Sequence, residues 1–161
     1  MLISRKPPKN IYDDAVDMIG NSPLIKMKNM CKKEGIKCEI LAKCESFMPG
    51  GSLKDRVGKR TVHDLEKLGK IKPGYTLIEA TSGNCGIGLA LLGAVKGYEV
   101  IITLPDKMSL EKSYVLSGFG AHTIRTPTDA PFNTKESHIG VAKTLNSEIE
   151  TSLFLDQVYL I

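Results

Sequence analysis

Apolar and polar residues follow two different periods along this chain, and they do so most regularly in its second half. From residue 76 onward, short apolar runs of strand length alternate with longer segments whose apolar residues recur at helical spacing. This pattern predicts strands at 76–80, 99–103, 121–125 and 152–155, and helices at 86–96, 110–117 and 135–146. Strands that alternate with helices form βαβ units. The predicted fold class is therefore α/β, a parallel sheet with flanking helices.

The first half of the chain is patterned more loosely. A polar arm of nine residues precedes Asn10, which could cap a short helix ended by Gly20. The pattern predicts helices at 11–19, about 30–34 and 53–68, and strands at 24–28 and 38–43. The helix at 86–96 is so apolar around its whole circumference that it must be buried.

Composition narrows the class of protein. The chain has 161 residues, of which 42% are hydrophobic and 25% charged, as expected for one globular domain. Its net charge of +4 is spread out, and no basic stripe with interleaved aromatic residues predicts nucleic-acid binding. No apolar run has the length of a membrane span, and the N-terminus has no signal-peptide pattern. We therefore expect no membrane partner and a cytoplasmic location.

The cysteines and histidines do not predict a metal site. The cysteines lack a C-x-x-C spacing, so we expect them to be free thiols in a reducing compartment. The histidines share no spacing typical of metal ligands. The residues concerned are Cys31, Cys38, Cys44 and Cys85, and His63, His122 and His138.

A first chemical motif surrounds Lys54 in the segment 49–56. Two glycines permit a tight turn, while Ser52 and Asp55 have the spacing of a capping box, which places Lys54 in the first helical turn. The helix dipole disfavours the ammonium there by only ~0.3–1 kcal/mol, so desolvation or a cofactor is also needed for a reactive amine. Spacing alone leaves two interpretations open, a solvated lysine at a capped helix start and a reactive lysine.

A second motif, residues 81–88, directly follows a predicted strand and opens the buried helix. Backbone N–H groups and hydroxyls at a helix N-terminus suit phosphate or carboxylate. The spacing is not G-x-G-x-x-G, so a dinucleotide is not predicted. A glycine-rich turn that permits close packing explains the same residues, and the pattern alone does not separate the two.

Together the two motifs resemble the cystathionine β-synthase and cysteine synthase family of fold-type II pyridoxal-phosphate (PLP) enzymes. The segment 50–56 is similar to the family's cofactor-lysine segment, and 81–86 to its Thr-Ser-Gly-Asn-Thr-Gly substrate loop. The 30 residues between Lys54 and Asn84 also agree. Segments 41–45, 107–112, 125–128 and 136–142 resemble cystathionine β-synthases more than plain cysteine synthases. The resemblance covers about residues 12–157 and implies the tryptophan synthase β-like fold.

The resemblance implies a cofactor, a reaction and roles for single residues. Lys54 would bind PLP covalently and transfer the substrate's α-proton, and Asn84 would hydrogen-bond the cofactor's 3′-oxygen. The implied reaction is β-replacement, in which homocysteine takes the place of the hydroxyl of serine. The pocket for the substrate carboxylate would be lined by Thr81, Ser82, Cys85 and Gln157.

Three departures from the family pattern qualify these expectations. Cys85 stands where the family has threonine, so a strong hydroxyl donor is replaced by a weak thiol donor. No cysteine or histidine precedes Asn10, so no haem is expected. The family continues beyond Ile161 for as long again, so we expect a truncated and inactive N-terminal half.

The resemblance also implies a domain division and leaves alternative functions. Residues 1–75 would form an arm and part of a large domain that carries the PLP lysine. Residues 76–161 would form a small βαβ domain with the substrate-carboxylate loop. The full-length relative would be a homodimer. The alternatives are a non-catalytic product that binds full-length subunits or an anionic metabolite, and a cysteine synthase that uses an activated serine and sulfide.

Overall fold

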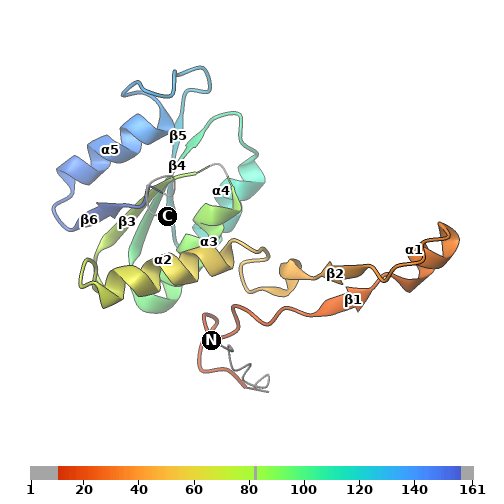
Figure 1. Cartoon of the computed structure of the whole chain (residues 1–161). Helices are drawn as coiled ribbons and strands as arrows, with labels where there is room; N and C mark the ends of the chain where they lie inside the picture. The colour runs from red at the N-terminus through yellow and green to blue at the C-terminus, as the bar shows by residue number, and fades with distance from the viewer. Residues whose placement is uncertain (1–10, 82, 157–161) are drawn as a thin grey trace.

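A computed structural model describes residues 11–81 and 83–156 of the chain (Figure 1). The first half contains β1 (Leu24–Lys26), α1 (Lys28–Lys33), β2 (Leu41–Lys43), the 3-10 helix η1 (Glu45–Phe47) and α2 (Asp55–Lys67). The second half contains β3 (Thr76–Ala80), α3 (Asn84–Lys96), β4 (Glu99–Pro105), α4 (Leu110–Gly118), β5 (His122–Thr126), α5 (His138–Glu148) and β6 (Ser152–Phe154).

A four-stranded parallel sheet lies at the centre of the molecule, which confirms the predicted fold class. Its strand order is β5-β4-β3-β6, and every neighbouring pair runs parallel. The chain therefore starts the sheet in its interior at β3, adds β4 and β5 on one side, and returns to place β6 on the other. The direction in which strands are added therefore reverses beside β3.

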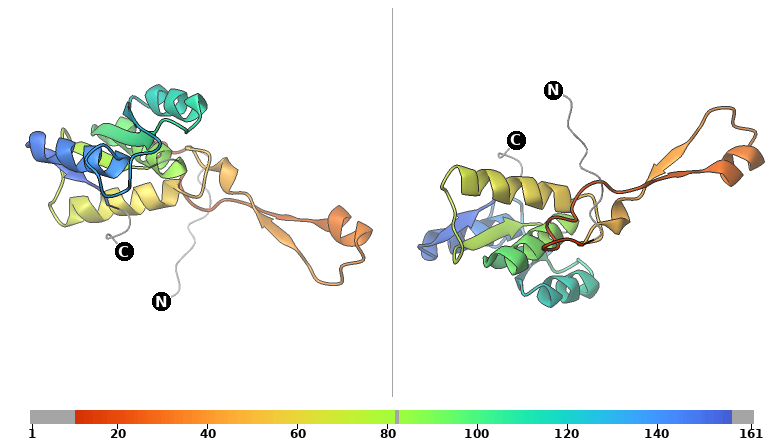
Figure 2. Two further views of the ribbon diagram at one scale, coloured as in Figure 1. Left: turned by 90° about the horizontal axis from the view of Figure 1, so that it is seen from above. Right: turned by 90° about the horizontal axis from the view of Figure 1, so that it is seen from below.

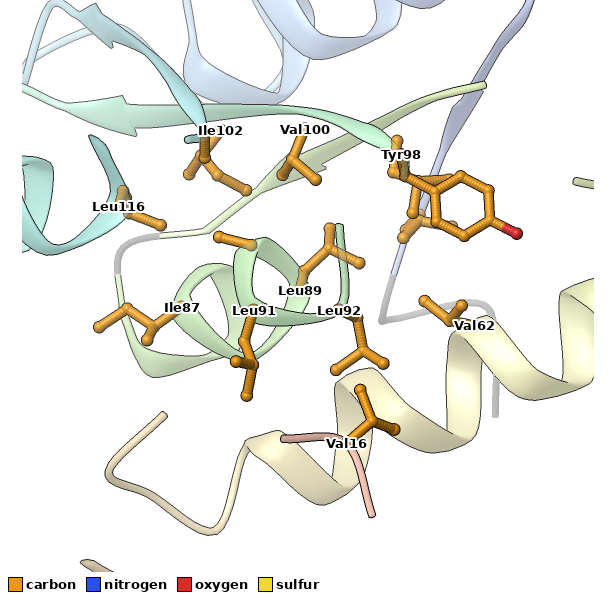
Figure 3. Packing of buried hydrophobic residues seen from close by; sticks show 14 of the residues in the cluster. Val16, Val62, Ile87, Leu89, Leu91, Leu92, Tyr98, Val100, Ile102 and Leu116 are labelled. Atoms are coloured by element: carbon orange, nitrogen blue, oxygen red, sulfur yellow. The ribbon is translucent and has the colours of Figure 1, made fainter. Parts of the chain in front are cut away.

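Helices cover both faces of the sheet (Figures 1 and 2). α5 contacts β3, β4 and β6 on one face, while α3 and α4 pack on the opposite face and α2 packs outside α3. Figure 3 shows α3 between Val100 and Ile102 of the sheet and Val62 of α2. Residues 86–93 of α3 are all buried, as the apolar sequence of this helix predicted. α2 thus belongs to the same hydrophobic core as the sheet.

The strands β1 and β2 form a separate antiparallel ribbon that projects from the core together with α1 (Figure 2). Leu24 lies opposite Lys43, and Lys26 lies opposite Leu41. Both strands are shorter than predicted. Each of the leucines is about half exposed, so the ribbon offers apolar surface with no covering layer in the described part of the chain.

The helix predicted at 11–19 is wrong, because this segment folds as turns. The carboxylate of Asp14 accepts hydrogen bonds from the backbone N–H groups of Val16 (2.7 Å) and Asp17 (3.1 Å). Such local side-chain bonds compete with the helical backbone ladder. Val16 and Ile19, the basis of the helical pattern, are instead buried in the core.

The helix α5 begins three residues later than predicted because of Ser137. Its hydroxyl accepts a hydrogen bond from the N–H of Gly140 (3.0 Å) and donates to backbone carbonyls in the preceding loop. Ser137 is therefore the N-cap, and the residues before it belong to that loop. The remaining elements of the second half match their predicted ranges to within about two residues.

Candidate functional site

Lys54 lies at the N-cap of α2 and is half-buried. The capping box predicted around it does not form. The Ser52 hydroxyl accepts from the N–H of Lys54 itself (3.2 Å), and the carboxylate of Asp55 accepts from the N–H of Gly50 (2.6 Å). Asp55 is fully buried, which raises the pKa of its carboxyl group above the usual value. Its contact with Gly50 holds the loop that carries Lys54 against the start of α2.

A second set of contacts anchors the residue that follows Asp55. The guanidinium of Arg56 donates to the carboxylate of Glu45 from Nε (2.9 Å), and the hydroxyl of Ser22 donates to the same carboxylate (2.6 Å). The Arg56 hydrogen bond, followed by that of Ser22, lowers the pKa of Glu45 to about 2. These bonds tie the Lys54 loop to η1 and to the segment that enters the ribbon.

The predicted substrate loop connects β3 to α3. The N–H of Thr81 donates to the carbonyl of Thr103 (3.1 Å), so the chain leaves the sheet beside β4. Asn84 is the first residue of α3, and Cys85 the second. A Cβ at Gly86 would lie 2.9 Å from the Thr81 methyl group, so only glycine lets Thr81 lie against the helix. The structure thus brings Thr81, Asn84 and Cys85 to one helix start.

Two of the predicted site residues, Ser82 and Gln157, lie outside the residues that the structure describes. Their predicted roles stay predictions. Thr81 follows β3 and Asp156 follows β6. Because β3 and β6 are parallel neighbours, both residues come after the carboxyl ends of their strands.

Close packing between α2 and α3 brings the two motifs together. A Cβ at Gly88 of α3 would lie only 2.9 Å from the Lys54 carbonyl oxygen, and a Cβ at Gly58 of α2 would lie 3.0 Å from the backbone of Gly88. The helices therefore meet backbone to backbone. Since Gly88 is about one helical turn from Asn84, the Lys54 backbone lies about one turn of α3 away from Asn84.

Lys112 is a residue of the site that the sequence patterns did not single out. From the first turn of α4, its ammonium donates a hydrogen bond to the side-chain oxygen of Asn84 (2.9 Å). An ammonium can only donate, so the oxygen of the Asn84 amide faces Lys112 and the two amide hydrogens face elsewhere. In the sequence, Lys112 is notable only as part of the segment 107–112, which resembles cystathionine β-synthases.

The location of these residues agrees with a general rule for open α/β sheets. Ligands bind outside the carboxyl ends of the strands, at the point where the strand order reverses. Here the order reverses between β3 and β6. The carboxyl end of β3 leads into Thr81, and that of β6 leads into Asp156. The geometry therefore favours a ligand site at this edge.

Two other kinds of feature are absent from the described residues. No three or more histidine, cysteine, aspartate or glutamate side chains gather there to hold a metal ion. Within the same ranges, no helix combines the length and the apolar character needed to cross a membrane.

Comparison with known proteins identifies the family. The model of the family described as pyridoxal-phosphate dependent enzyme matches residues 16–159. The chain belongs to this family of PLP-dependent enzymes. The sequence-based recognition and the predicted cofactor are thereby confirmed, since the family is defined by its dependence on PLP.

The similar proteins of this PLP-dependent family include cystathionine β-synthases. That of Rattus norvegicus is 53% identical over 155 residues, 96% of this chain and 28% of its own length. That of Dictyostelium discoideum is 57% identical over 149 residues, 92% of this chain and 30% of its own length. The chain thus spans less than a third of these relatives.

A more distant relative and a solved structure extend the comparison. The O-acetylserine dependent cystathionine β-synthase of Bacillus subtilis is 40% identical over 142 residues, 88% of this chain and 45% of its own length. A crystal structure of a hydrogen sulfide-producing enzyme from Fusobacterium nucleatum superposes with a TM-score of 0.83 at 33% identity. The superposition covers 94% of this chain and 48% of the Fusobacterium nucleatum enzyme. The likeness extends through the fold as well as the sequence.

The donor set of the site fits PLP. The cofactor requires a primary amine for covalent attachment and hydrogen-bond donors for its anionic oxygens. Lys54 carries the amine, and the Asn84 amide has its N–H groups directed away from Lys112. The start of α3 adds the partial positive charge of a helix N-terminus.

Proposed function

We propose that this chain carries part of the active site of a PLP-dependent β-replacement enzyme that condenses serine with homocysteine to cystathionine. The observation that carries the proposal is the contact of Gly58 with Gly88, which joins the Lys54 loop to the helix that begins at Asn84. The names of the relatives at 53–57% identity support the reaction.

Each residue would act through a specific atom. The Lys54 amine would hold the cofactor and move a proton to and from the substrate's α-carbon. The amide N–H of Asn84 would donate to the cofactor's 3′-oxygen. PLP, when bound, supplies the electron sink that makes removal of the α-proton possible. The substrate carboxylate would be bound by Thr81, Ser82, Cys85 and Gln157.

The choice between serine and an activated serine rests on the relatives. The relative named as O-acetylserine dependent is 40% identical, and a cysteine synthase of Flavobacterium is 41% identical over 118 residues. Both are more distant than the cystathionine β-synthases of Rattus norvegicus and Dictyostelium discoideum, which favours serine. Assays of serine and O-acetylserine in parallel separate the two reactions.

The ribbon supports a second proposal, that this chain binds subunits of a longer relative. Leu24 and Leu41 are 57% and 46% exposed, and neither has a covering layer in the described part of the chain. An exposed strand pair of this kind can accept a further strand. The homodimer and the domain division at residue 75 stay predictions.

Lys54 is expected to be the only lysine that PLP labels specifically. Borohydride reduction fixes the cofactor to the lysine that holds it, and peptide mapping identifies that lysine. We expect label on Lys54 in the wild type and none at this peptide in Lys54→Ala. Lys67, exposed at the far end of the same helix, is the matched control as Lys67→Ala. Equal labelling of many lysines, unchanged in Lys54→Ala, would contradict the proposed site.

Replacing Lys112 is expected to release the amide of Asn84. In Lys112→Met the side-chain amide signals of Asn84 should shift in the NMR spectrum, and PLP affinity should fall about three- to tenfold, as for loss of one charged hydrogen bond near solvent. Lys112→Arg should restore much of both. The control Lys135→Met removes the same charge from an exposed loop residue. An unchanged Asn84 signal in Lys112→Met would show that the contact does not orient the amide.

A further inference from the structure

Glu79 is a buried acidic residue that the proposed reaction does not use. It lies in β3, two residues before the Thr81 loop, and is only 4% exposed. Its Oε2 atom has no hydrogen-bond partner among the residues that the structure describes. A buried carboxylate oxygen without a hydrogen-bond partner disfavours the charged form of the side chain.

The side chain faces a small cavity where three elements meet. α2, α3 and the segment after β6 each contribute to its wall. The other lining residues are Val57, Gly58, Thr61, Cys85, Leu89 and Leu155. Gly58 makes the close helix contact and Cys85 lies in the first turn of α3. The cavity therefore lies at the junction that positions the proposed site.

The groups around Glu79 do not balance a negative charge. α2 offers only the hydroxyl of Thr61, and α3 only the thiol of Cys85. On β4 the residue opposite Glu79 in register is Ile102. After β6, the carboxylate of Asp156 adds a repulsive charge. Within the described residues, no lysine, arginine or histidine lines the cavity.

We infer that Glu79 is a positioning residue: as a neutral acid it lets the first turn of α3 close onto α2, and loss of its proton loosens that turn. The turn carries Asn84 and Cys85, so the inference deepens the proposed function and rests on it for its catalytic meaning. Burial, followed by the charge of Asp156, raises the pKa of Glu79 to about 8. The neutral form then prevails at neutral pH, and the ionised form at alkaline pH.

The protonation state can be measured directly on the 161-residue chain without cofactor. Carboxyl carbons of the 13C-labelled chain are followed by NMR through a titration from acid to alkaline pH, and the Glu79 signal is assigned by its loss in Glu79→Gln. We expect its midpoint near 8, well above those of the exposed carboxyl groups. A Glu79 signal that titrates together with the exposed carboxyl groups would overturn the inference.

The positioning role has its own measurement. The backbone amide signals of Asn84 and Gly86 should shift with the same alkaline midpoint as Glu79, and this shift should vanish in Glu79→Gln. Because a cysteine thiol also titrates in the alkaline range, the experiment is repeated in Cys85→Ser, where the shift must persist. Glu99→Gln, an exposed acid on the neighbouring strand, is the control that must keep it.

The outcomes separate the two proposals. An alkaline amide shift that remains in Glu79→Gln, or that disappears in Cys85→Ser alone, assigns the transition to another group and overturns the positioning role. Neither measurement involves PLP. A failed borohydride experiment would therefore contradict the proposed function while the result on Glu79 stands.

Discussion

The free energy of unfolding is expected to fall by about 3–5 kcal/mol between pH 4.5 and pH 8 through Glu79 alone. The unfolded-state pKa of a glutamate is 4.5 and the folded-state pKa of Glu79 is about 8. In this window the folded chain binds a proton that the unfolded chain has lost. Unfolding therefore becomes more favourable as the pH rises, and the destabilisation is complete above pH 8.

Urea unfolding at a series of pH values measures this dependence. Glu79→Gln should remove most of the slope and become more stable than the wild type at alkaline pH, whereas Glu99→Gln should keep the wild-type slope. The carboxyl group of Glu45 does not interfere, because its lowered pKa makes its contribution disappear only as the pH falls from 4.5 toward about 2. A wild-type slope in Glu79→Gln would assign the effect to other groups.

Gly88→Ala is expected to lower the free energy of unfolding by about 1–3 kcal/mol, the range for overpacking a close contact. The new methyl group would lie 2.9 Å from the Lys54 carbonyl oxygen and 3.1 Å from the Asp55 Cα atom. Both are backbone atoms, so α2 itself must move. The better helix propensity of alanine offsets only about 1 kcal/mol.

The matched control for this substitution is Gly118→Ala in α4. A Cβ at Gly118 meets no atom within 4 Å, so this variant should be neutral or slightly stabilised. Denaturant midpoints of the two variants give the comparison. Because displacement of α2 moves Lys54 away from Asn84, Gly88→Ala should also weaken specific PLP labelling of Lys54. Equal stability of the two variants would show that the helix contact tolerates a methyl group.

The local patterns of the second half were sufficient to predict its elements. In β3, β4 and α3, most of the positions that the sheet and helix bury are apolar, with Glu79 and Thr103 as exceptions, so periodicity and burial largely agree. The segment 11–19 shows the opposite case. Its apolar spacing suited a helix, but the side chain of Asp14 bonds the backbone locally and Val16 and Ile19 pack as part of a turn. Spacing alone does not distinguish these outcomes.

For the candidate site, too, some residues could be found from the sequence and others only from the structure. Residue type and spacing marked the segments around Lys54 and Asn84 as candidates, and the resemblance to the family assigned roles to Lys54, Thr81, Asn84 and Cys85, which stay predictions. The contact of Lys112 with Asn84 joins residues 28 positions apart, and no periodicity records it. The roles of Gly58 and Gly88 depend on two helices meeting backbone to backbone.

The sequence by itself determined the order of strands and helices in the second half, the family, and the chemical groups available to the cofactor. The tertiary structure alone decided which of those groups meet, because distances across the chain are set by how helices cross and how strands are ordered. It also decided the burial of Glu79. From the sequence, a glutamate in a strand is expected to be an exposed polar residue. Only the packing of α2, α3 and the end of β6 around Glu79 removes the water that would stabilise its charge.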